Sequence, residues 1–300
     1  MENQEIDALR QELQDHMAAE NLSGAAIGKA IGYSSGVVSG WLRGSYDGNI
    51  DRLCQAVASY LERFRERKLR VFDMPFIETS VSKKVFEIAR ICHLDNELGV
   101  CVSHAGLGKT MAVKEYAKLN TDTILVEADS GYTPIVLFNE IADKLGVENS
   151  KNLHILMDSL IQKLAGSGRL IIVDEAEHLP YKALELLRRI YDKAQVGILL
   201  VGMPKLIKNM RGNAGEYKQL YSRVGVYGQL DPLKPIDVQN TVAAAISNAA
   251  ENLWQPFLKE CRSNMRVLVK LLRRSQRIAS VNGTEINEEI VREAGKTLIV

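Results

Sequence analysis

The stretch Ser103-His-Ala-Gly-Leu-Gly-Lys-Thr110 decides the fold of this chain. The apolar segment 99–102 precedes it and predicts a buried strand, and residues 111–119 follow with the apolar spacing of a helix. Glycine lets successive backbone N–H groups face a phosphate, and the amino end of the new helix adds a positive dipole end. A glycine-rich turn in this context, ending in Lys-Thr, predicts a phosphate-binding P-loop.

Each position of the loop has an expected role. Lys109 reaches the β- and γ-phosphates of ATP, and the Thr110 hydroxyl binds Mg²⁺. Ser103 stands where P-loops usually have their first glycine, and because that position shapes the loop entry, we expect the change to be tolerated. The residues predicted to bind the nucleotide are Ala105, Gly106, Leu107, Gly108, Lys109, Thr110 and Met111, joined by Arg266 from the last segment.

A second motif, Arg169-Leu-Ile-Ile-Val-Asp-Glu175, is an apolar run that ends in two carboxylates. The run predicts a buried parallel strand, and ligands of open α/β sheets bind at the carboxyl ends of the strands. Downstream of a P-loop, Asp174 is the expected Mg²⁺ ligand, through a water molecule, and Glu175 is expected to polarise the water that attacks the γ-phosphate. We interpret His178 as a surface or helix-capping histidine, and the alternative is a contact with the nucleotide or a signal to a neighbouring subunit.

Two further positions bear on hydrolysis. Residues 197–201 predict a strand beside the phosphate-binding strand, and proteins of this kind often carry a polar side chain at its end to orient the attacking water. Here the end contains Met203 and no evident polar group, so slow unaided hydrolysis is expected. Arg223 is predicted to reach the γ-phosphate of a neighbouring subunit, and a plain surface arginine is the alternative.

The pattern of apolar residues divides the chain into four parts. Helical spacing dominates the start, strands alternate with helices in the middle, and helices return from Asp237, a plausible N-cap. This alternation indicates an α/β fold with a parallel sheet. The expected strands are 99–103, 123–127, 170–173 and 197–201. The expected domains are a helical helix-turn-helix domain at 1–65, a linker at 66–78, a P-loop core at 79–232 and a small helical lid at 233–300.

Composition excludes several classes of protein. A chain of 300 residues that is 46% hydrophobic and 25% charged is neither disordered nor collagen-like. Its four cysteines form no C-x-x-C pair, so buried reduced thiols are expected instead of a zinc site. The chain has no signal peptide or membrane-length apolar run, which predicts a cytoplasmic protein without a membrane partner. The formal net charge of +1 predicts no nucleic-acid partner unless charge is concentrated in one segment.

Residues 22–44 have the pattern of a helix-turn-helix. A first helix ends at Gly32, where the turn needs a small residue, and a second helix over 34–42 directs small polar groups outward. The side chains expected to face double-stranded DNA are Ser35, Ser39 and Arg43. This face is weakly basic, so it would touch phosphates without reading bases. The alternative is a three-helix module of the same shape that docks a protein.

These elements together resemble the AAA+ ATPases, and more closely the target-DNA activators of Mu-like transposable phages. The likeness includes the helix-turn-helix, the P-loop, Phe76-Ile-Glu-Thr79, Ile172-Val-Asp-Glu-Ala-Glu-His-Leu179 and Leu220-Tyr-Ser-Arg223. The resemblance implies ATP-dependent, sequence-non-specific DNA binding, assembly of copies of the chain into helical filaments, delivery of target DNA to a transposase and stimulation of strand transfer. It also implies Mg²⁺-dependent ATP hydrolysis that releases the DNA, in the host-cell cytoplasm.

Basic residues concentrate in the last segment, where Glu260 is the only acid between positions 259 and 277. Positions 266, 270, 273, 274 and 277 follow helical spacing and are expected to share one face. A solvated helix face is the common explanation for such a run, and contact with phosphates or a transposase is the alternative. In that alternative, the residues that bind DNA are Lys270, Arg273 and Arg274.

Other functions stay open at this point. A helper ATPase of replication or of another transposon class would share every nucleotide motif and differ in its partners. A protein-remodelling or secretion-type ATPase would use the N-terminal module for docking. ATP-dependent filaments on arbitrary duplex DNA would favour the DNA-bound functions, whereas a DNA affinity that ATP leaves unchanged would favour protein remodelling.

Overall fold

A computed structural model describes residues 3–69, 74–212, 218–246 and 250–298. The chain forms two compact units, residues 1–73 and 74–300, and each is described by itself. The predicted linker at 66–78 spans their boundary: the last helix of the first unit runs on to Leu69, and residues 70–73 lie outside the described part. The predicted division of the second unit into core and lid stays a prediction, because both belong to one compact unit.

The first unit is helical, as predicted. Its helices are α1 Asn3–Ala19, α2 Gly24–Ile31, α3 Ser35–Leu42 and α4 Ile50–Leu69. Ser34 is the N-cap of α3, because its hydroxyl accepts a hydrogen bond from the backbone N–H of Val37. Gly32 ends α2 with a φ of 79°, in the left-handed region that favours glycine. The two helices and the tight turn expected over 22–44 are therefore present, while their use in binding DNA stays a prediction.

The described strands of the second unit form a five-stranded parallel sheet in the order β2-β3-β4-β1-β5. They are β1 Leu98–Val102, β2 Thr123–Glu127, β3 Leu170–Asp174, β4 Gly197–Gly202 and β5 Val224–Gln229. The four expected strands are present, and β4 pairs with β1 as expected. The sequence did not predict β5, because this edge strand contains two glycines and exposed side chains instead of a continuous apolar run.

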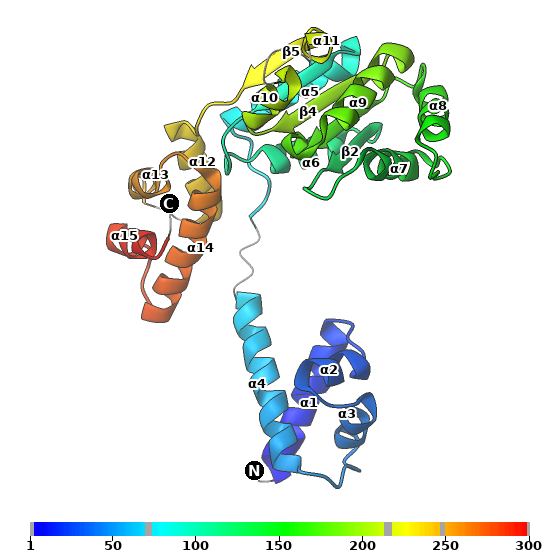
Figure 1. Ribbon diagram of the computed structural model, residues 1–300. Coiled ribbons are helices and arrows are strands. Elements are labelled where there is room, and N and C mark those ends of the chain that lie inside the picture. Colours follow the sequence, from blue (N-terminus) through cyan, green and yellow to red (C-terminus); the bar gives the residue numbers. More distant parts are fainter. Residues whose placement is uncertain (1–2, 70–73, 213–217, 247–249, 299–300) are drawn as a thin grey trace. The chain divides into compact units, whose positions relative to one another are not determined.

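Helices cover both faces of the sheet (Figure 1). They are α5 Ser80–Asp95, α6 Lys109–Leu119, α7 Pro134–Leu145, α8 Leu153–Leu164, the 3-10 helix η1 Ala176–His178, α9 Tyr181–Ala194, α10 Lys205–Arg211 and α11 Lys218–Tyr221. Along β1, Gly99 faces Cys92 of α5, whereas Val100 packs into the core formed with α7, α8 and α9. Successive residues of a strand point to opposite faces, which explains why the central strands are apolar throughout.

The described helices of the predicted lid follow the sheet: α12 Pro235–Ala245, α13 Trp254–Cys261, α14 Met265–Asn282 and α15 Glu288–Lys296. The prediction that Asp237 is the N-cap of α12 is wrong, since it lies within the first turn. Its carboxylate accepts hydrogen bonds from the backbone N–H of Lys234 at 2.8 Å, and from the N–H and hydroxyl of Ser80 at 2.7 and 2.5 Å. These bonds satisfy a buried charge and join the start of α12 to the start of α5.

The four cysteines are free and buried, as predicted. Burial raises the pKa of the Cys92 and Cys101 thiols to about 12, so both stay protonated and act as small apolar side chains. Within the described ranges, no helix combines the length and apolar character needed to cross a membrane.

Candidate nucleotide-binding site

The P-loop joins β1 to α6 at the carboxyl edge of the sheet. Gly106 and Gly108 have φ values of 85° and 99°, and α6 begins at Lys109. The turn thus presents the unpaired N–H groups and the dipole of a helix start to an anion. The loop residues that line the adjoining pocket are Ala105, Gly106, Gly108, Lys109, Thr110 and Met111. Leu107 is not among these lining residues, because its side chain is buried, and contact of its backbone N–H with a phosphate stays a prediction.

Lys109 is buried, and its ammonium group donates three hydrogen bonds of 3.0 Å within its own loop. The acceptors are the carbonyl oxygens of Ser103 and His104 and the hydroxyl of Ser103. Burial lowers the pKa of Lys109, and the carboxylates of Asp174 and Glu177 oppose this effect. Ser103 therefore contacts the lysine directly, a role beyond the loop entry that the sequence did not predict.

Asp174 ends β3 and is 2% exposed. Its Oδ1 accepts a hydrogen bond from the backbone N–H of Glu175 at 2.9 Å, whereas Oδ2 is buried without a partner among the described residues. Burial raises the pKa of Asp174, and the Thr110 side chain and the Glu175 N–H partly oppose that rise. An unpartnered carboxylate oxygen beside a threonine hydroxyl fits an oxygen-preferring cation, so Thr110 and Asp174 are suited to hold Mg²⁺.

Glu175 follows with a φ of 54°, a left-handed conformation that is uncommon for a residue with a side chain. The turn leads into η1 and leaves the Glu175 side chain 44% exposed, at the rim of the pocket. Nε2 of His178 lies 3.5 Å from its carboxylate, and His178 is itself partly exposed, as expected. A partly solvated carboxylate in this place is suited to take a proton from water.

Glu177 lines the same pocket, although the sequence assigned it no role. It is 6% exposed, and its Oε2 accepts a 3.0 Å hydrogen bond from the backbone N–H of Met203, directly after β4. The Glu177 carbonyl accepts from Nδ2 of Asn209 in α10 at 2.9 Å. Gly202 leaves room for the carboxylate, since a Cβ there would lie 2.1 Å from Oε2. Only the pairing of β3 with β4 brings this glutamate to Met203, so sequence spacing gave no signal for it.

The lid helix α14 contacts the P-loop. Asn264, the N-cap of α14, donates from Nδ2 to the Ala105 carbonyl at 3.0 Å, and the backbone N–H of Arg266 donates to the Gly106 carbonyl at 2.9 Å. The close approach requires a glycine at 106, because a Cβ would lie 2.4 Å from Oδ1 of Asn264. Arg266 lines the pocket, where the sequence placed it. Asn264 was missed, although an Asn before a helical run is an N-cap signal.

The basic residues of α14 lie on one side of the helix, where Arg266, Lys270, Arg273 and Arg277 are exposed and Arg274 is half-buried. Lys270 also lines the nucleotide pocket beside Arg266. Arg274 differs from the other basic residues because its guanidinium donates to the carbonyl and hydroxyl of Thr297 after α15, and its contact with DNA stays a prediction. Adjacent helical residues point about 100° apart, so Arg274 turns toward α15 while Arg273 faces solvent.

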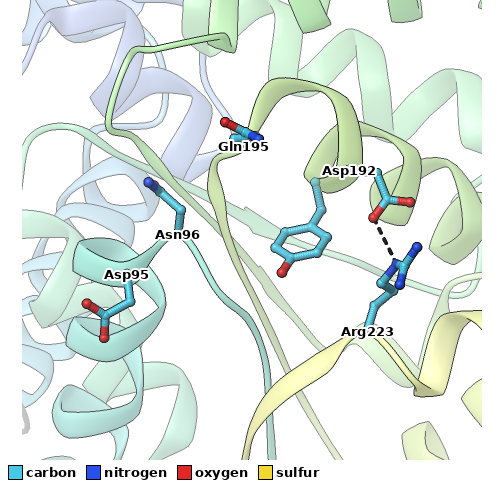
Figure 2. A pocket seen from close by; sticks show the side chains of 6 residues that line it. Asp95, Asn96, Asp192, Gln195 and Arg223 are labelled. Atoms are coloured by element: carbon cyan, nitrogen blue, oxygen red, sulfur yellow. Dashed lines mark hydrogen bonds and ion pairs between the residues drawn. The ribbon is translucent and has the colours of Figure 1, made fainter.

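Arg223 lies at the opposite edge of the sheet, directly before the amino end of β5. Its Nε donates to Oδ1 of Asp192 in α9 at 3.1 Å (Figure 2). Asp95, Asn96 and Gln195 line the same surface pocket. The P-loop follows the carboxyl end of β1, so the structure does not bring Arg223 to the nucleotide pocket of its own chain.

The first unit presents the three residues that we expected to face DNA. Ser35, Ser39 and Arg43 are exposed on or directly after α3, whereas Val38 and Trp41 of the same helix are buried. The polar and apolar positions thus separate as the sequence predicts.

The comparisons with known proteins agree with this geometry. A family model described as an AAA domain matches residues 93–210. The Mu-like prophage FluMu DNA transposition protein B of Haemophilus influenzae is 32% identical over 238 residues, which are 77% of this chain and 83% of that protein. The ATP-dependent target DNA activator B of Escherichia phage Mu is 26% identical over 84% of this chain and 83% of that protein.

Solved structures resemble the second unit's fold. The ADP form of the Aeropyrum pernix ORC2 protein has a TM-score of 0.56 at 17% identity, over 76% of this chain and 72% of that one. A Walker-type ATPase of Pyrococcus abyssi has a TM-score of 0.56 at 16% identity, over 75% and 74%. The predicted AAA+ P-loop fold is confirmed.

Proposed function

Because the chain belongs to the family of Mu-like phage DNA transposition protein B and is an ATPase of the AAA+ class, we propose that it binds double-stranded DNA in an ATP-dependent, sequence-non-specific manner. In this proposal, copies of the chain form helical filaments that select target DNA and deliver it to a transposase, with stimulation of strand transfer. ATP hydrolysis then drives release. The relative in phage Mu is itself named an ATP-dependent target DNA activator. The site of action is the host-cell cytoplasm.

The direct hydrogen bonding between the lid and the P-loop is the observation that carries the proposal. The carbonyls of Ala105 and Gly106 accept hydrogen bonds from Asn264 and Arg266. The same loop would bind phosphates through its N–H groups, so a bound nucleotide acts on the backbone that holds α14. Because α14 carries exposed arginines, the nucleotide can thereby control where a basic surface lies.

The residues of the nucleotide site take the following roles in the proposal. Lys109 binds the β- and γ-phosphates, and Thr110 and Asp174 hold Mg²⁺, which when bound neutralises charge on the phosphate oxygens. Glu175 is the base for the attacking water. Arg223 stabilises the transition-state charge at a neighbour's γ-phosphate, a role that its 53% exposed side chain supports.

Two surfaces are proposed to touch DNA phosphates. One is α3 with Ser35, Ser39 and Arg43, and the other is the exposed side of α14 with Arg273. One subunit offers few positive charges, so its DNA affinity is expected to be weak and salt-dependent. A filament would align these surfaces along the duplex, which reconciles a net charge of +1 with DNA binding.

Replacement of Lys109 by alanine tests the proposal. Hydrogen bonds to a charged group contribute about 1.5 to 3 kcal/mol each, so nucleotide affinity should fall roughly 10- to 100-fold and nucleotide-dependent DNA binding should be lost. The measurement is fluorescence anisotropy of an arbitrary duplex with and without a non-hydrolysable ATP analogue, at two salt concentrations, with electron microscopy of the same samples.

Lys114→Ala is the matched control, because Lys114 lies on the same helix, pairs with Glu127 at 2.9 Å and does not line the pocket. Parent protein whose DNA affinity does not respond to the analogue would contradict the proposal and favour a protein-remodelling ATPase. Filaments whose rate of ATP hydrolysis does not change when a transposase is added would favour a replication helper.

A further inference from the structure

A buried carboxylate occupies the end of β4, where the sequence offered no polar side chain. Met203 provides only its backbone there, and the N–H of Met203 donates to Oε2 of Glu177 at 3.0 Å. Glu177 is 6% exposed and lines the nucleotide pocket together with Asp174 and Glu175. One backbone hydrogen bond satisfies only part of a buried carboxylate, so the position of Glu177 requires an explanation.

We propose that Glu177 orients the attacking water in ATP hydrolysis, together with Glu175, and so replaces the missing polar side chain at Met203. This inference rests on the role assigned above to Glu175. It adds a second carboxylate, supplied by η1, to the hydrolytic site.

The spacing of the two carboxylates fits one shared water molecule. Oxygen atoms of Glu175 and Glu177 lie within 4.8 Å of each other. A water that donates two hydrogen bonds of about 2.8 Å at its own bond angle joins acceptors about 4.4 Å apart. When both O–H groups are held in this way, a lone pair of the oxygen faces away from the carboxylates and is free to attack.

The reaction balances with these two residues. The water oxygen forms a bond to the γ-phosphorus, and the bond from that phosphorus to the β–γ bridging oxygen breaks, so ADP leaves. Glu175 accepts one proton of the water and returns it to solvent after the step. Glu177 accepts a hydrogen bond from the other O–H and takes no proton, so its contribution is orientation.

The surroundings of Glu177 fix it for this task. The Met203 N–H holds one carboxylate oxygen, and Nδ2 of Asn209 holds the Glu177 backbone carbonyl at 2.9 Å. Gly202 is part of the arrangement, because an added Cβ would lie 2.1 Å from Oε2 and displace the carboxylate. The Glu177 carboxylate can therefore keep its position only while residue 202 is a glycine.

Three variants of the full chain test the proposal. Glu177→Ala removes the carboxylate, Gly202→Ala displaces it without removing it, and Glu177→Ala combined with Met203→Asn places a polar side chain at the end of β4. Glu127→Gln is the matched control: Glu127 is paired in register with Asp174 at the same edge of the sheet, yet it pairs with Lys114 and does not line the pocket.

Turnover number, KM for ATP, affinity for a fluorescent ATP analogue and the thermal midpoint are measured for each variant, with Mg²⁺ and with or without duplex DNA. We expect the turnover number to fall about 100-fold in Glu177→Ala and in Gly202→Ala, while analogue affinity stays at the parent value and the thermal midpoint falls by no more than a few degrees, because one buried hydrogen bond is lost. Met203→Asn should restore part of the turnover lost in Glu177→Ala. Glu127→Gln should behave as the parent.

Parent-like turnover in Glu177→Ala would overturn the proposal. A loss of analogue affinity and thermal midpoint that matches the loss of turnover, without recovery by Met203→Asn, would also overturn it and make Glu177 a structural residue. A wrong assignment of Glu175 as the base would give a different result. Undiminished turnover in Glu175→Gln would show that Glu175 is not the base, whatever the turnover of the Glu177 variants.

Discussion

At the carboxyl edge of the sheet, Lys109, Asp174 and Glu177 are buried around one pocket, whereas at the amino edge Arg223 and Asp192 form an exposed ion pair. At the first edge, one carboxylate oxygen of Asp174 has no hydrogen-bond partner within the described part of the chain. At the second edge, Arg223 already has Asp192 of its own chain as a partner. A single chain therefore has the residues needed to bind nucleotide, whereas Arg223 must leave Asp192 of its own chain before it can act on a neighbouring subunit.

The largest expected effect comes from Arg223→Ala. An arginine supplied to the γ-phosphate of a neighbour accelerates hydrolysis by about 10³-fold or more, so turnover should fall by that order while nucleotide affinity stays unchanged. Turnover is measured against protein concentration, and affinity with a fluorescent ATP analogue.

Mixing provides the decisive control for this variant. Arg223→Ala subunits have an intact P-loop, and Lys109→Ala subunits have an intact Arg223, so a mixture should recover activity that neither has alone. If the mixture showed no more turnover than its components, or if Arg223→Ala alone kept full turnover, Arg223 would be an ordinary surface residue. The two edges of the sheet would then not differ in the way described above.

A smaller effect is expected on stability from Asp174→Asn. The neutral amide removes a buried charge with an unpartnered oxygen, so the nucleotide-free protein should gain about 1 to 2 kcal/mol in free energy of unfolding, while Mg²⁺-dependent nucleotide binding is lost. Urea unfolding with and without MgATP measures both.

The stability advantage of Asp174→Asn should depend on pH, and the direction of that dependence follows from the pKa of Asp174. Burial raises the pKa of Asp174 in the folded chain above its unfolded value, so protonation favours the folded state. At a pH above the folded-state pKa, the ionised Asp174 carboxylate lowers the free energy of unfolding by its full amount. This loss of stability fades as the pH falls toward the pKa of the carboxyl in the unfolded chain. The advantage of Asp174→Asn should therefore shrink on acidification, and a constant advantage would contradict the burial argument.

The smallest effect is expected from Asp192→Asn. An exposed ion pair contributes about 0.2 to 1 kcal/mol, so release of Arg223 should raise turnover at low protein concentration by no more than about fivefold. Arg188 also pairs with Asp192 and would keep its ion pair with Glu185 in this variant, so the fold should be unaffected. The same substitution in an Arg223→Ala background is the control, and a rise there would show that the ion pair is not the cause.

Local patterns explain what could be predicted. The P-loop, the four apolar strands and the lid helices follow from residues close in sequence, because phosphate binding and helical or strand periodicity are local properties. The strand β5 escaped prediction because its glycines and exposed side chains lack the apolar run of a buried strand. The N-cap prediction for Asp237 overlooked the start signal of Pro235, a residue favoured at the first position of a helix and found there in α12.

The residues of the candidate site also fall into those that local sequence predicted and those whose contacts depend on distant parts of the chain. Lys109, Thr110, Asp174 and Glu175 belong to continuous motifs, and the structure brings them to one pocket as predicted. Lys270 was expected to contact DNA and lines that pocket, and Arg274 binds Thr297. A periodicity argument gives the face of a helix but not the element that packs against it.

The sequence by itself determined the phosphate-binding turn, the acidic end of β3 and the order of helices and strands, since each depends on the conformational preferences of neighbouring residues. Only the tertiary structure decided that Glu177 reaches the end of β4, that Asn264 contacts the P-loop and that Arg223 faces the other edge of the sheet. These contacts join distant residues, and their geometry exists only when the parallel strands pair and place the loops at their ends.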